Sequence, residues 1–303
     1  MSSSEGADTL DRLVTESRRA DNDYASLSTQ ELVELMNTED ASVPEAVGTA
    51  TAAIAGALDA IVERLAGGGR LVYLGAGTSG RIAALDAEEC EGTFSTRPGQ
   101  VVALVAGADA SSADARAAAE DDAHAGRSAV EELGVSSADA VVGISASGRT
   151  PYVLGGLEAA AEAGALTVAL VSANGSPLAR EADHELAVIV GPEVVSGSTR
   201  LKAGTAQKLV LNTISTVTMI RLGRTYGGLM VGVVPANEKL RERARRNVVI
   251  ATGASEESVD EALNAAAGDA RVALVSLLAG VDAQDARSRL EASEGSVRKA
   301  AGQ

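Results

Sequence analysis

The chain has 303 residues, of which 46% are hydrophobic, and this is enough to bury one main core and a smaller second one. Its 42 acidic residues outnumber its 26 basic residues and give a formal net charge of −16, which argues against a surface for nucleic acid or anionic lipid. Cys90 is the only cysteine, so an intramolecular disulfide is excluded. These limits favour a small-molecule ligand.

The sequence carries no sign of export or of a membrane anchor. The segment Met1–Leu10 is polar and acidic, and no apolar run reaches the roughly 18 residues that a membrane-spanning helix needs. His124 and His184 lie far apart and have no cysteine at ligand spacing, so we predict no metal site. We therefore expect a cytoplasmic protein that binds neither a metal nor a membrane.

Two helices are predicted ahead of the first strand. Ser28 and Glu31 have the spacing of a capping box, which predicts that a helix begins there. A long second helix is predicted from Val43 to Leu65, because the glycines at 67–69 would end it.

Five short apolar runs are predicted to be buried strands, and Ala-rich helical stretches lie between them. The runs cover residues 70–77, 101–107, 140–146, 166–173 and 185–191. Strands that alternate with helices along a chain usually form a parallel sheet with helices on both faces. The sequence therefore predicts an α/β fold.

The last part of the chain is predicted to be helical. A long helix from Leu201 to about Gly223 and a glycine-rich turn at 226–228 precede a charged helix that begins at Asn237. An imperfect repeat follows, in which Gly268 matches Gly295 at an offset of 27 residues. We predict two domains, residues 1–236 and a small UBA-like helical bundle at 237–303.

Two loops carry the chemistry of an anion-binding site. "GAGTSGR" (75–81) and "SASGRTP" (145–151) each follow a predicted strand and precede a predicted helix. Ligands of open α/β sheets bind beyond the carboxyl ends of the strands, where helix N-termini present free N–H groups. Glycine lets the backbone approach an anion, and hydroxyls donate further hydrogen bonds. Both loops are predicted to bind a phosphorylated small molecule.

A dinucleotide is the competing ligand for the first loop. Gly75, Gly77 and Gly80 match the spacing G-x-G-x-x-G. However, no acidic residue ends the next strand in the manner that binds a ribose, and no Walker-type lysine follows either loop. The nucleotide interpretation is therefore disfavoured.

Four motifs in the same order resemble the N-acetylmuramic acid 6-phosphate etherases of the sugar isomerase (SIS) superfamily. They are "GAGTSGR", "GISASGRTPYV", "VGPEVVSGSTRLKAGTAQKLVLN" and "NEKLRERARR", and the resemblance runs from about Thr15 to the C-terminus. It implies a three-layer SIS domain with a five-stranded parallel sheet flanked by helices, and a small C-terminal helical domain. It also implies a homodimer that binds a sugar phosphate and uses no metal or nucleotide cofactor.

The resemblance also implies a reaction. Etherases of this family remove the D-lactyl ether from carbon 3 of N-acetylmuramic acid 6-phosphate and give N-acetylglucosamine 6-phosphate and D-lactate, in cell-wall sugar recycling. The aldehyde of the open-chain sugar acidifies the hydrogen on carbon 2, so elimination followed by hydration is chemically reasonable. Two carboxyl groups held in different protonation states can supply the proton transfers.

Helical spacing alone does not select one acid among Asp86, Glu88, Glu89 and Glu91. The family pattern "LDAxEC" selects Glu89 as a catalytic residue and "AAAEDD" adds Glu120, while the identity of the base stays open. By the same resemblance, Ser79 contacts the sugar, and further residues are expected to bind the ligand: Ser145, Ser147, Thr150, Ser198 and Lys202.

One departure and two alternatives accompany the resemblance. Glu91 and Gly92 stand where two prolines are expected in the family, so the turn near Glu89 should be less rigid.

A non-catalytic sugar-phosphate sensor, like the glucokinase regulatory protein, would use the same two loops, and an aldose–ketose isomerase is a further alternative. The presence of both Glu89 and Glu120 in a chain with a single SIS domain favours the enzyme.

Overall fold

The computed structural model describes residues 14–17, 24–232 and 238–303. The segment Met1–Leu10 and the predicted boundary between residues 236 and 237 lie outside these residues. The chain divides into two compact units: residues 1–87 with 101–214, and residues 88–100 with 215–303. We call them unit 1 and unit 2.

Unit 1 contains the predicted parallel sheet. Its strands are β1 (Leu71–Gly75), β2 (Val101–Val105), β3 (Ala140–Ile144), β4 (Leu166–Val171) and β5 (His184–Ala187). They pair in the order β2-β1-β3-β4-β5, and every pair is parallel. All five residues of β1 are buried, as is typical of a strand covered on both faces. The predicted α/β class and the five strands are confirmed.

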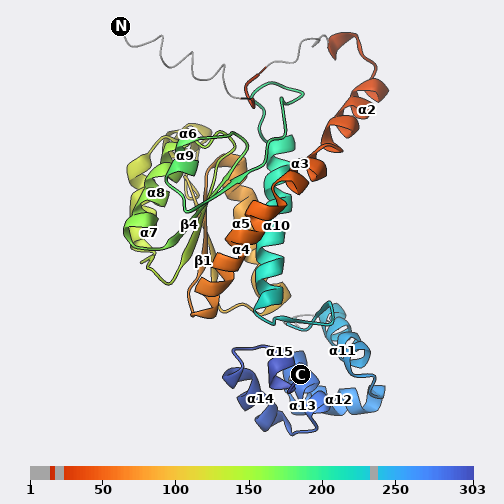
Figure 1. The fold of residues 1–303 in the computed structure, drawn as a ribbon. Coiled ribbons are helices and arrows are strands. Elements are labelled where there is room, and N and C mark those ends of the chain that lie inside the picture. The colour runs from red at the N-terminus through yellow and green to blue at the C-terminus, as the bar shows by residue number, and fades with distance from the viewer. Residues whose placement is uncertain (1–13, 18–23, 233–237) are drawn as a thin grey trace. The chain divides into compact units, whose positions relative to one another are not determined.

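Helices cover both faces of this sheet (Figure 1). One layer holds α6 (Ala113–Glu120), α7 (Ala123–Glu132), α8 (Pro151–Glu162) and α9 (Pro177–Arg180). The other layer holds α4 (Thr51–Ala66) and the first parts of α5 (Gly77–Phe94) and α10 (Lys202–Arg221). The division between the two units falls within α5 and α10.

The first N-terminal helix begins where the sequence predicts it, whereas the second predicted helix is divided into two. After the short η1 (Tyr24–Ser26), α2 (Thr29–Asp40) begins at the predicted capping box, where Glu31 Oε2 accepts from the Ser28 backbone N–H at 2.7 Å. The predicted single helix from Val43 to Leu65 is wrong, because α3 (Val43–Thr49) and α4 are separated at Ala50. The chain bends by 59° there.

Two threonines account for this break. The Thr49 and Thr51 hydroxyls donate to the carbonyl oxygens of Ala46 and Gly48, each at 2.7 Å. Hydroxyls that bond to nearby carbonyls compete with the regular helical pattern. Ala50 itself, whose backbone N–H donates to Val47 O at 3.0 Å, is held in a tighter turn.

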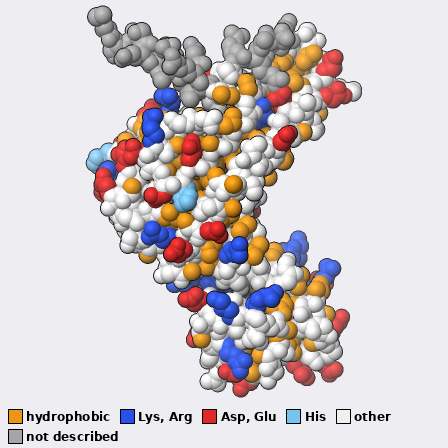
Figure 2. All heavy atoms as spheres, in the orientation of Figure 1, with side chains coloured by type: hydrophobic (Ala, Val, Ile, Leu, Met, Phe, Trp, Pro, Cys, Tyr) orange, Lys and Arg blue, Asp and Glu red, His pale blue; other side chains and the backbone are white. Residues whose placement is uncertain are grey.

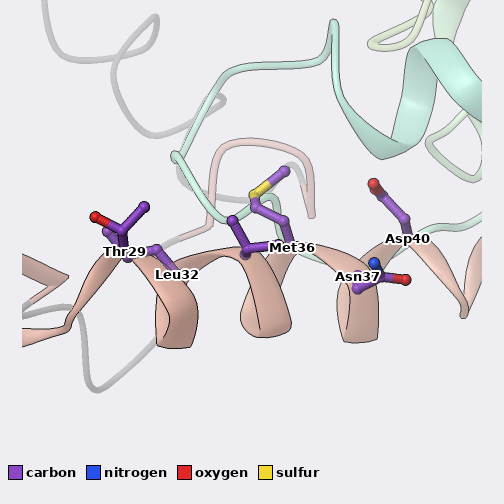
Figure 3. Close-up of a pocket in the computed structure, with 6 residues that line it drawn as sticks. Thr29, Leu32, Met36, Asn37 and Asp40 are labelled. Atoms are coloured by element: carbon purple, nitrogen blue, oxygen red, sulfur yellow. The ribbon is translucent and has the colours of Figure 1, made fainter.

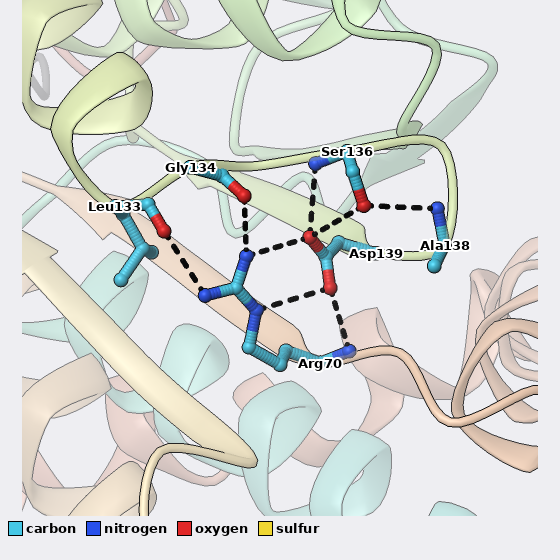
Figure 4. Close-up of polar contacts among 6 residues, drawn as sticks. All are labelled: Arg70, Leu133, Gly134, Ser136, Ala138 and Asp139. Carbon is cyan, nitrogen blue, oxygen red and sulfur yellow. Dashed lines mark hydrogen bonds and ion pairs between the residues drawn. The ribbon is translucent and has the colours of Figure 1, made fainter.

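An ion pair between the half-buried Arg70 and the buried Asp139 joins the starts of β1 and β3 (Figure 4). The carboxylate of Asp139 accepts from the Arg70 backbone N–H at 2.8 Å, from its Nη2 at 2.8 Å and from the Ser136 N–H at 2.9 Å. The same guanidinium donates to the Leu133 and Gly134 carbonyls, which close the turn after α7. One side-chain pair therefore fixes two strands and a turn.

Helices α7 and α8 pack with their backbones in contact. A side chain at Gly126 would collide with the Tyr152 carbonyl, and one at Gly155 would collide with the Ala123 carbonyl. Only glycine permits such an approach. The two helices therefore form one block on this face of the sheet.

Unit 2 is built mainly from helices that pack around α13 (Ala270–Ala279). The others are α11 (Glu238–Thr252), α12 (Glu256–Ala265), α14 (Ala283–Ala292) and α15 (Val297–Ala300), and a hairpin joins β6 (Thr225–Tyr226) to β7 (Leu229–Met230). The predicted repeat is confirmed, because Gly268 and Gly295 both have φ of 84° and each precedes a capped helix.

No single helix of the described residues is both long and apolar enough to cross a membrane. Two bent helix pairs, 29–49 with 51–66 and 256–265 with 270–279, reach that length and composition only together.

Candidate active site

The two predicted loops lie next to each other at the carboxyl edge of the sheet. Gly75, the last residue of β1, pairs in register with Ile144, the last residue of β3. The chain leaves β1 toward β2 on one side and leaves β3 toward β4 on the other. Ligands of open α/β sheets bind at such a reversal of strand order. The strand order therefore brings the two predicted loops side by side at the carboxyl edge of the sheet.

The loop after β3 gathers three hydroxyl groups. Ser145 is buried, and its Oγ lies 2.9 Å from Thr150 Oγ1 and 3.4 Å from Ser147 Oγ. The same oxygen accepts from the Gly148 N–H at 3.0 Å, which holds the turn closed. The structure therefore brings Ser145, Ser147 and Thr150 together.

Helix α8 begins directly after these hydroxyls. Thr150 is its N-cap residue but does not cap the helix through its side chain, and Pro151 follows at the first position. A helix N-terminus carries a partial positive charge, which favours an anion. Hydroxyl donors beside a helix start are the combination that suits a phosphate group.

The loop after β1 is covered by the start of α10. A methyl group at Gly204 would lie 3.6 Å from Thr78 Cγ2, so the two helices approach closely at this point. The Ser79 hydroxyl donates to Gln207 Oε1 at 2.9 Å. Gln207 is 2% exposed, and its Nε2 has no hydrogen-bond partner among the described residues.

Gln207 is a candidate that the sequence analysis missed. A buried amide nitrogen without a partner is unusual in a folded protein, and here it belongs to a side chain that contacts the predicted sugar-binding serine. Periodicity could have found it, because Gln207 interrupts a buried and mostly apolar stripe of α10. The apolar members of this stripe are Ala203, Val210, Leu211 and Ile214.

Glu120 ends helix α6 and faces the first loop. A methyl group at Gly77 would lie 3.7 Å from Glu120 Oε2, so the carboxylate stands over the start of α5. Burial raises the pKa of Glu120, and the neighbouring negative charge of Asp121 raises it further. Carboxyl groups with raised pKa values are suited to proton transfer near neutral pH.

The acids of α5 differ in burial. Asp86 is 3% exposed and accepts from the hydroxyl of Tyr73, itself fully buried in β1, at 2.9 Å. Glu89 is exposed one turn further along the helix. Glu89 belongs to unit 2 and Glu120 to unit 1, so the predicted pairing of these two residues stays a prediction.

Lys202 occupies a different environment from that of a surface lysine. It is 4% exposed, and its ammonium donates to Glu39 Oε2 at 2.7 Å. Its backbone N–H donates to Glu193, a fully buried carboxylate that also accepts from the Ala203 N–H and so caps α10. Ser198 lies half-buried in the segment before this helix. The ligand contacts expected of Ser198 and Lys202 stay predictions.

The described part of the chain has no group of side chains arranged to bind a metal ion. No group of three or more His, Cys, Asp or Glu side chains among those residues could hold an ion. The polar groups at the two loops are hydroxyls, an amide, a carboxylate and the guanidinium groups of Arg81 and Arg149, which are suited to hydrogen bonding and proton transfer.

Family models match the sheet region of this chain. The model of the glucokinase regulatory protein N-terminal SIS domain matches residues 53–161, and the SIS domain model matches residues 123–216. A solved phosphoheptose isomerase from Francisella tularensis is similar in fold, with a TM-score of 0.53 at 21% identity, over 64% of this chain and 100% of that chain.

Relatives that match nearly the whole chain decide the family. An N-acetylmuramic acid 6-phosphate etherase from Rubrobacter xylanophilus is 55% identical over 97% of this chain and 97% of its own length. An etherase of the same name from Streptomyces avermitilis is 51% identical over 96% of this chain and 94% of its own length. The chain therefore belongs to the N-acetylmuramic acid 6-phosphate etherase family.

Proposed function

We propose that the protein cleaves the D-lactyl ether of N-acetylmuramic acid 6-phosphate with net addition of water and forms N-acetylglucosamine 6-phosphate and D-lactate. The observation that carries this proposal is the 55% identity to an etherase over 97% of both chains. The hydroxyl loop at the start of α8 supports a phosphorylated substrate. A cytoplasmic location rests on the sequence alone and stays a prediction.

The reaction needs only proton transfers and water. A base removes the hydrogen on carbon 2, the bond from carbon 3 to the ether oxygen breaks, and an acid protonates the departing oxygen. Water then adds across the new double bond. We assign the carbon 2 proton to Glu120, because its raised pKa makes it a stronger base than an ordinary carboxylate. The proton for departing lactate is assigned to Glu89, on the family pattern.

Production of D-lactate tests the proposal directly. Purified protein incubated with N-acetylmuramic acid 6-phosphate should release D-lactate well above a control without enzyme. The regulatory alternative predicts tight binding of the sugar phosphate without release of lactate. That outcome would overturn the etherase assignment while leaving the phosphate site intact.

The hydroxyl loop leads to a prediction about affinity. Ser147→Ala should weaken binding of the sugar 6-phosphate by roughly 1 to 3 kcal/mol, the value expected for one charge-assisted hydrogen bond. Calorimetric titration of the wild type and the variant measures this difference. Ser196→Ala removes a hydroxyl that donates to the Glu16 carbonyl and serves as control. Equal affinity for the sugar with and without its phosphate would contradict the assignment of this loop.

Asp121 provides a prediction about pH. As a base, Glu120 must be ionised, so activity is lost as the pH falls through its raised pKa. Asp121→Asn removes one cause of that raised pKa and should move the acid limb of kcat/KM to lower pH. Glu132→Gln, which changes an exposed acid of α7, is the charge-matched control and should not move it. An unchanged acid limb in Asp121→Asn would show that Glu120 is not the group that limits activity in acid.

The homodimer is also a proposal, and α2 offers the surface for it. This helix has no buried residue, and a pocket on it is lined by Leu32, Val33 and Met36 with three polar neighbours (Figure 3). Val33 is 58% exposed, and Figure 2 shows hydrophobic side chains reaching the surface on this part of the chain. A helix without buried residues gains little from its own chain. A second copy that covers this face would supply the missing contacts.

Sedimentation measurements test this surface. Val33→Glu should weaken the dimer about 10-fold or more, because it would bury a charge in an apolar contact. Thr38→Glu adds the same charge on the opposite side of α2 and should leave the dimer intact. A monomeric wild type at micromolar concentration would overturn the proposal.

A further inference from the structure

Arg224 of unit 2 has a buried nitrogen to which no acceptor among the described residues hydrogen-bonds. Its Nε is shielded from solvent and has no hydrogen-bond partner within the described residues. A buried charged donor without an acceptor is costly, and nearly all such groups in native proteins are paired. The proposed etherase reaction gives Arg224 no role. None of the described residues supplies an acceptor for this Nε.

The guanidinium is held in place by backbone on one side. A methyl group at Gly295 would lie 3.0 Å from Arg224 Cζ, so the guanidinium rests directly on this glycine. Gly295 is at φ 84°, in the turn between α14 and α15. The residue before Arg224, Gly223, in turn packs against Ser296. Arg224 is thus positioned by two glycine contacts.

Two further guanidinium groups, those of Arg271 and Arg97, lie close enough to act on the charge of Arg224. Burial lowers the pKa of Arg224, and the charges of Arg271 and Arg97 lower it further. Arg271 has an acidic partner, because its Nη2 lies 3.3 Å from Asp269 Oδ2. In a chain with a net charge of −16, a group of arginines around a half-buried guanidinium is unexpected as an ordinary solvated surface. Figure 2 shows several basic side chains, with acidic ones among them, on the visible face of this unit.

We propose that Arg224, with Arg271 and Arg97, forms a binding site for a phosphate group in the C-terminal helical unit. A phosphate carries about −1.5 to −2 charges near pH 7, which matches several guanidinium groups better than a carboxylate does. Its oxygens can accept two parallel hydrogen bonds from one guanidinium, including one from Nε. These residues are different from those of the loop after β3, so the proposal does not rest on the etherase function.

The Nε–H signal of Arg224 in ¹⁵N-labelled full-length protein reports occupancy directly. Absence of this signal from Arg224→Lys, which keeps the charge but lacks Nε, identifies it. Inorganic phosphate, added at constant ionic strength, is expected to shift the signal in a saturable manner. Glucose 6-phosphate should shift it as well, whereas glucose should not. A response to glucose 6-phosphate alone would assign the site to phosphate esters and still support the proposal.

Calorimetry with inorganic phosphate provides the affinity. In a Ser147→Ala background, which weakens the other phosphate loop, Arg224→Gln should lower the remaining affinity about 10-fold or more. Arg243→Gln removes an exposed charge from α11 of the same unit and should change it little. If Arg224→Gln does not fold, the titration of the wild-type signal decides alone. No shift with phosphate, or an equal shift with chloride or acetate, would overturn the proposal.

Discussion

Glu89→Gln is expected to abolish release of lactate while retaining some exchange of the carbon 2 hydrogen with deuterated solvent. Glutamine keeps the shape of the side chain but cannot donate a proton as a carboxylic acid does. The loss of lactate release should be about 10² to 10⁴-fold, the contribution of a general acid. Proton exchange by NMR and lactate by enzymatic assay, measured on the same samples, separate the two half-reactions.

Glu120→Gln should behave differently, because loss of the base lowers exchange as well as release. Glu88→Gln changes the exposed neighbour of Glu89 on α5 and should leave both rates near those of the wild type. The role assignment fails if Glu89→Gln loses exchange and Glu120→Gln retains it. If both variants release lactate at near-normal rates, neither glutamate is catalytic.

Asp139→Ala is expected to destabilise the protein by about 1 to 3 kcal/mol, the cost of leaving partly buried donors without their acceptor. The carboxylate is 2% exposed and accepts hydrogen bonds from Arg70 and Ser136, so its removal leaves several donors without an acceptor. Unfolding in urea measures the change. Asp285→Ala breaks an exposed ion pair to Arg289 and should cost less than about 1 kcal/mol.

The ion pair between Asp139 and Arg70 also predicts that the protein loses stability in acid. Burial alone would raise the pKa of Asp139, but hydrogen bonds and the charge of Arg70 outweigh it and lower the pKa. A lowered folded pKa stabilises the protein above the unfolded pKa, and this contribution is lost as the pH falls through the folded value. The difference in stability between wild type and Asp139→Ala should therefore shrink below about pH 4. A difference that stays constant in acid would contradict this account.

Features that depend on neighbouring residues were predictable from the sequence. Each strand is a short apolar run ended by a turn residue, and the capping box at Ser28 depends on a contact three residues away. The two hydroxyl loops were found because they follow strands. Their adjacency then follows from the strand order, which places β1 beside β3. The break at Ala50 was missed because it depends on the conformation of two threonine hydroxyls, which periodicity does not register.

The properties of the candidate site depend on contacts between distant parts of the chain. Ser79 and Gln207 are 128 residues apart, so no local pattern links them. Lys202 meets Glu39 across 163 residues, and this contact is what buries a lysine that the sequence alone does not distinguish from a surface residue. The raised pKa of Glu120 likewise comes first from burial, a property of the folded chain. Sequence reasoning supplied Glu89 and Glu120 only through the family resemblance.

The backbone contact between α7 and α8 has a consequence for the speed of the proposed reaction. Glu120 lies three residues before α7, and the hydroxyl loop leads directly into α8. Because these helices touch at Gly126 and Gly155, the proposed proton acceptor and phosphate holder belong to one stiff frame. The entropy lost in aligning them is then spent once, when the chain folds, and not again in each catalytic cycle.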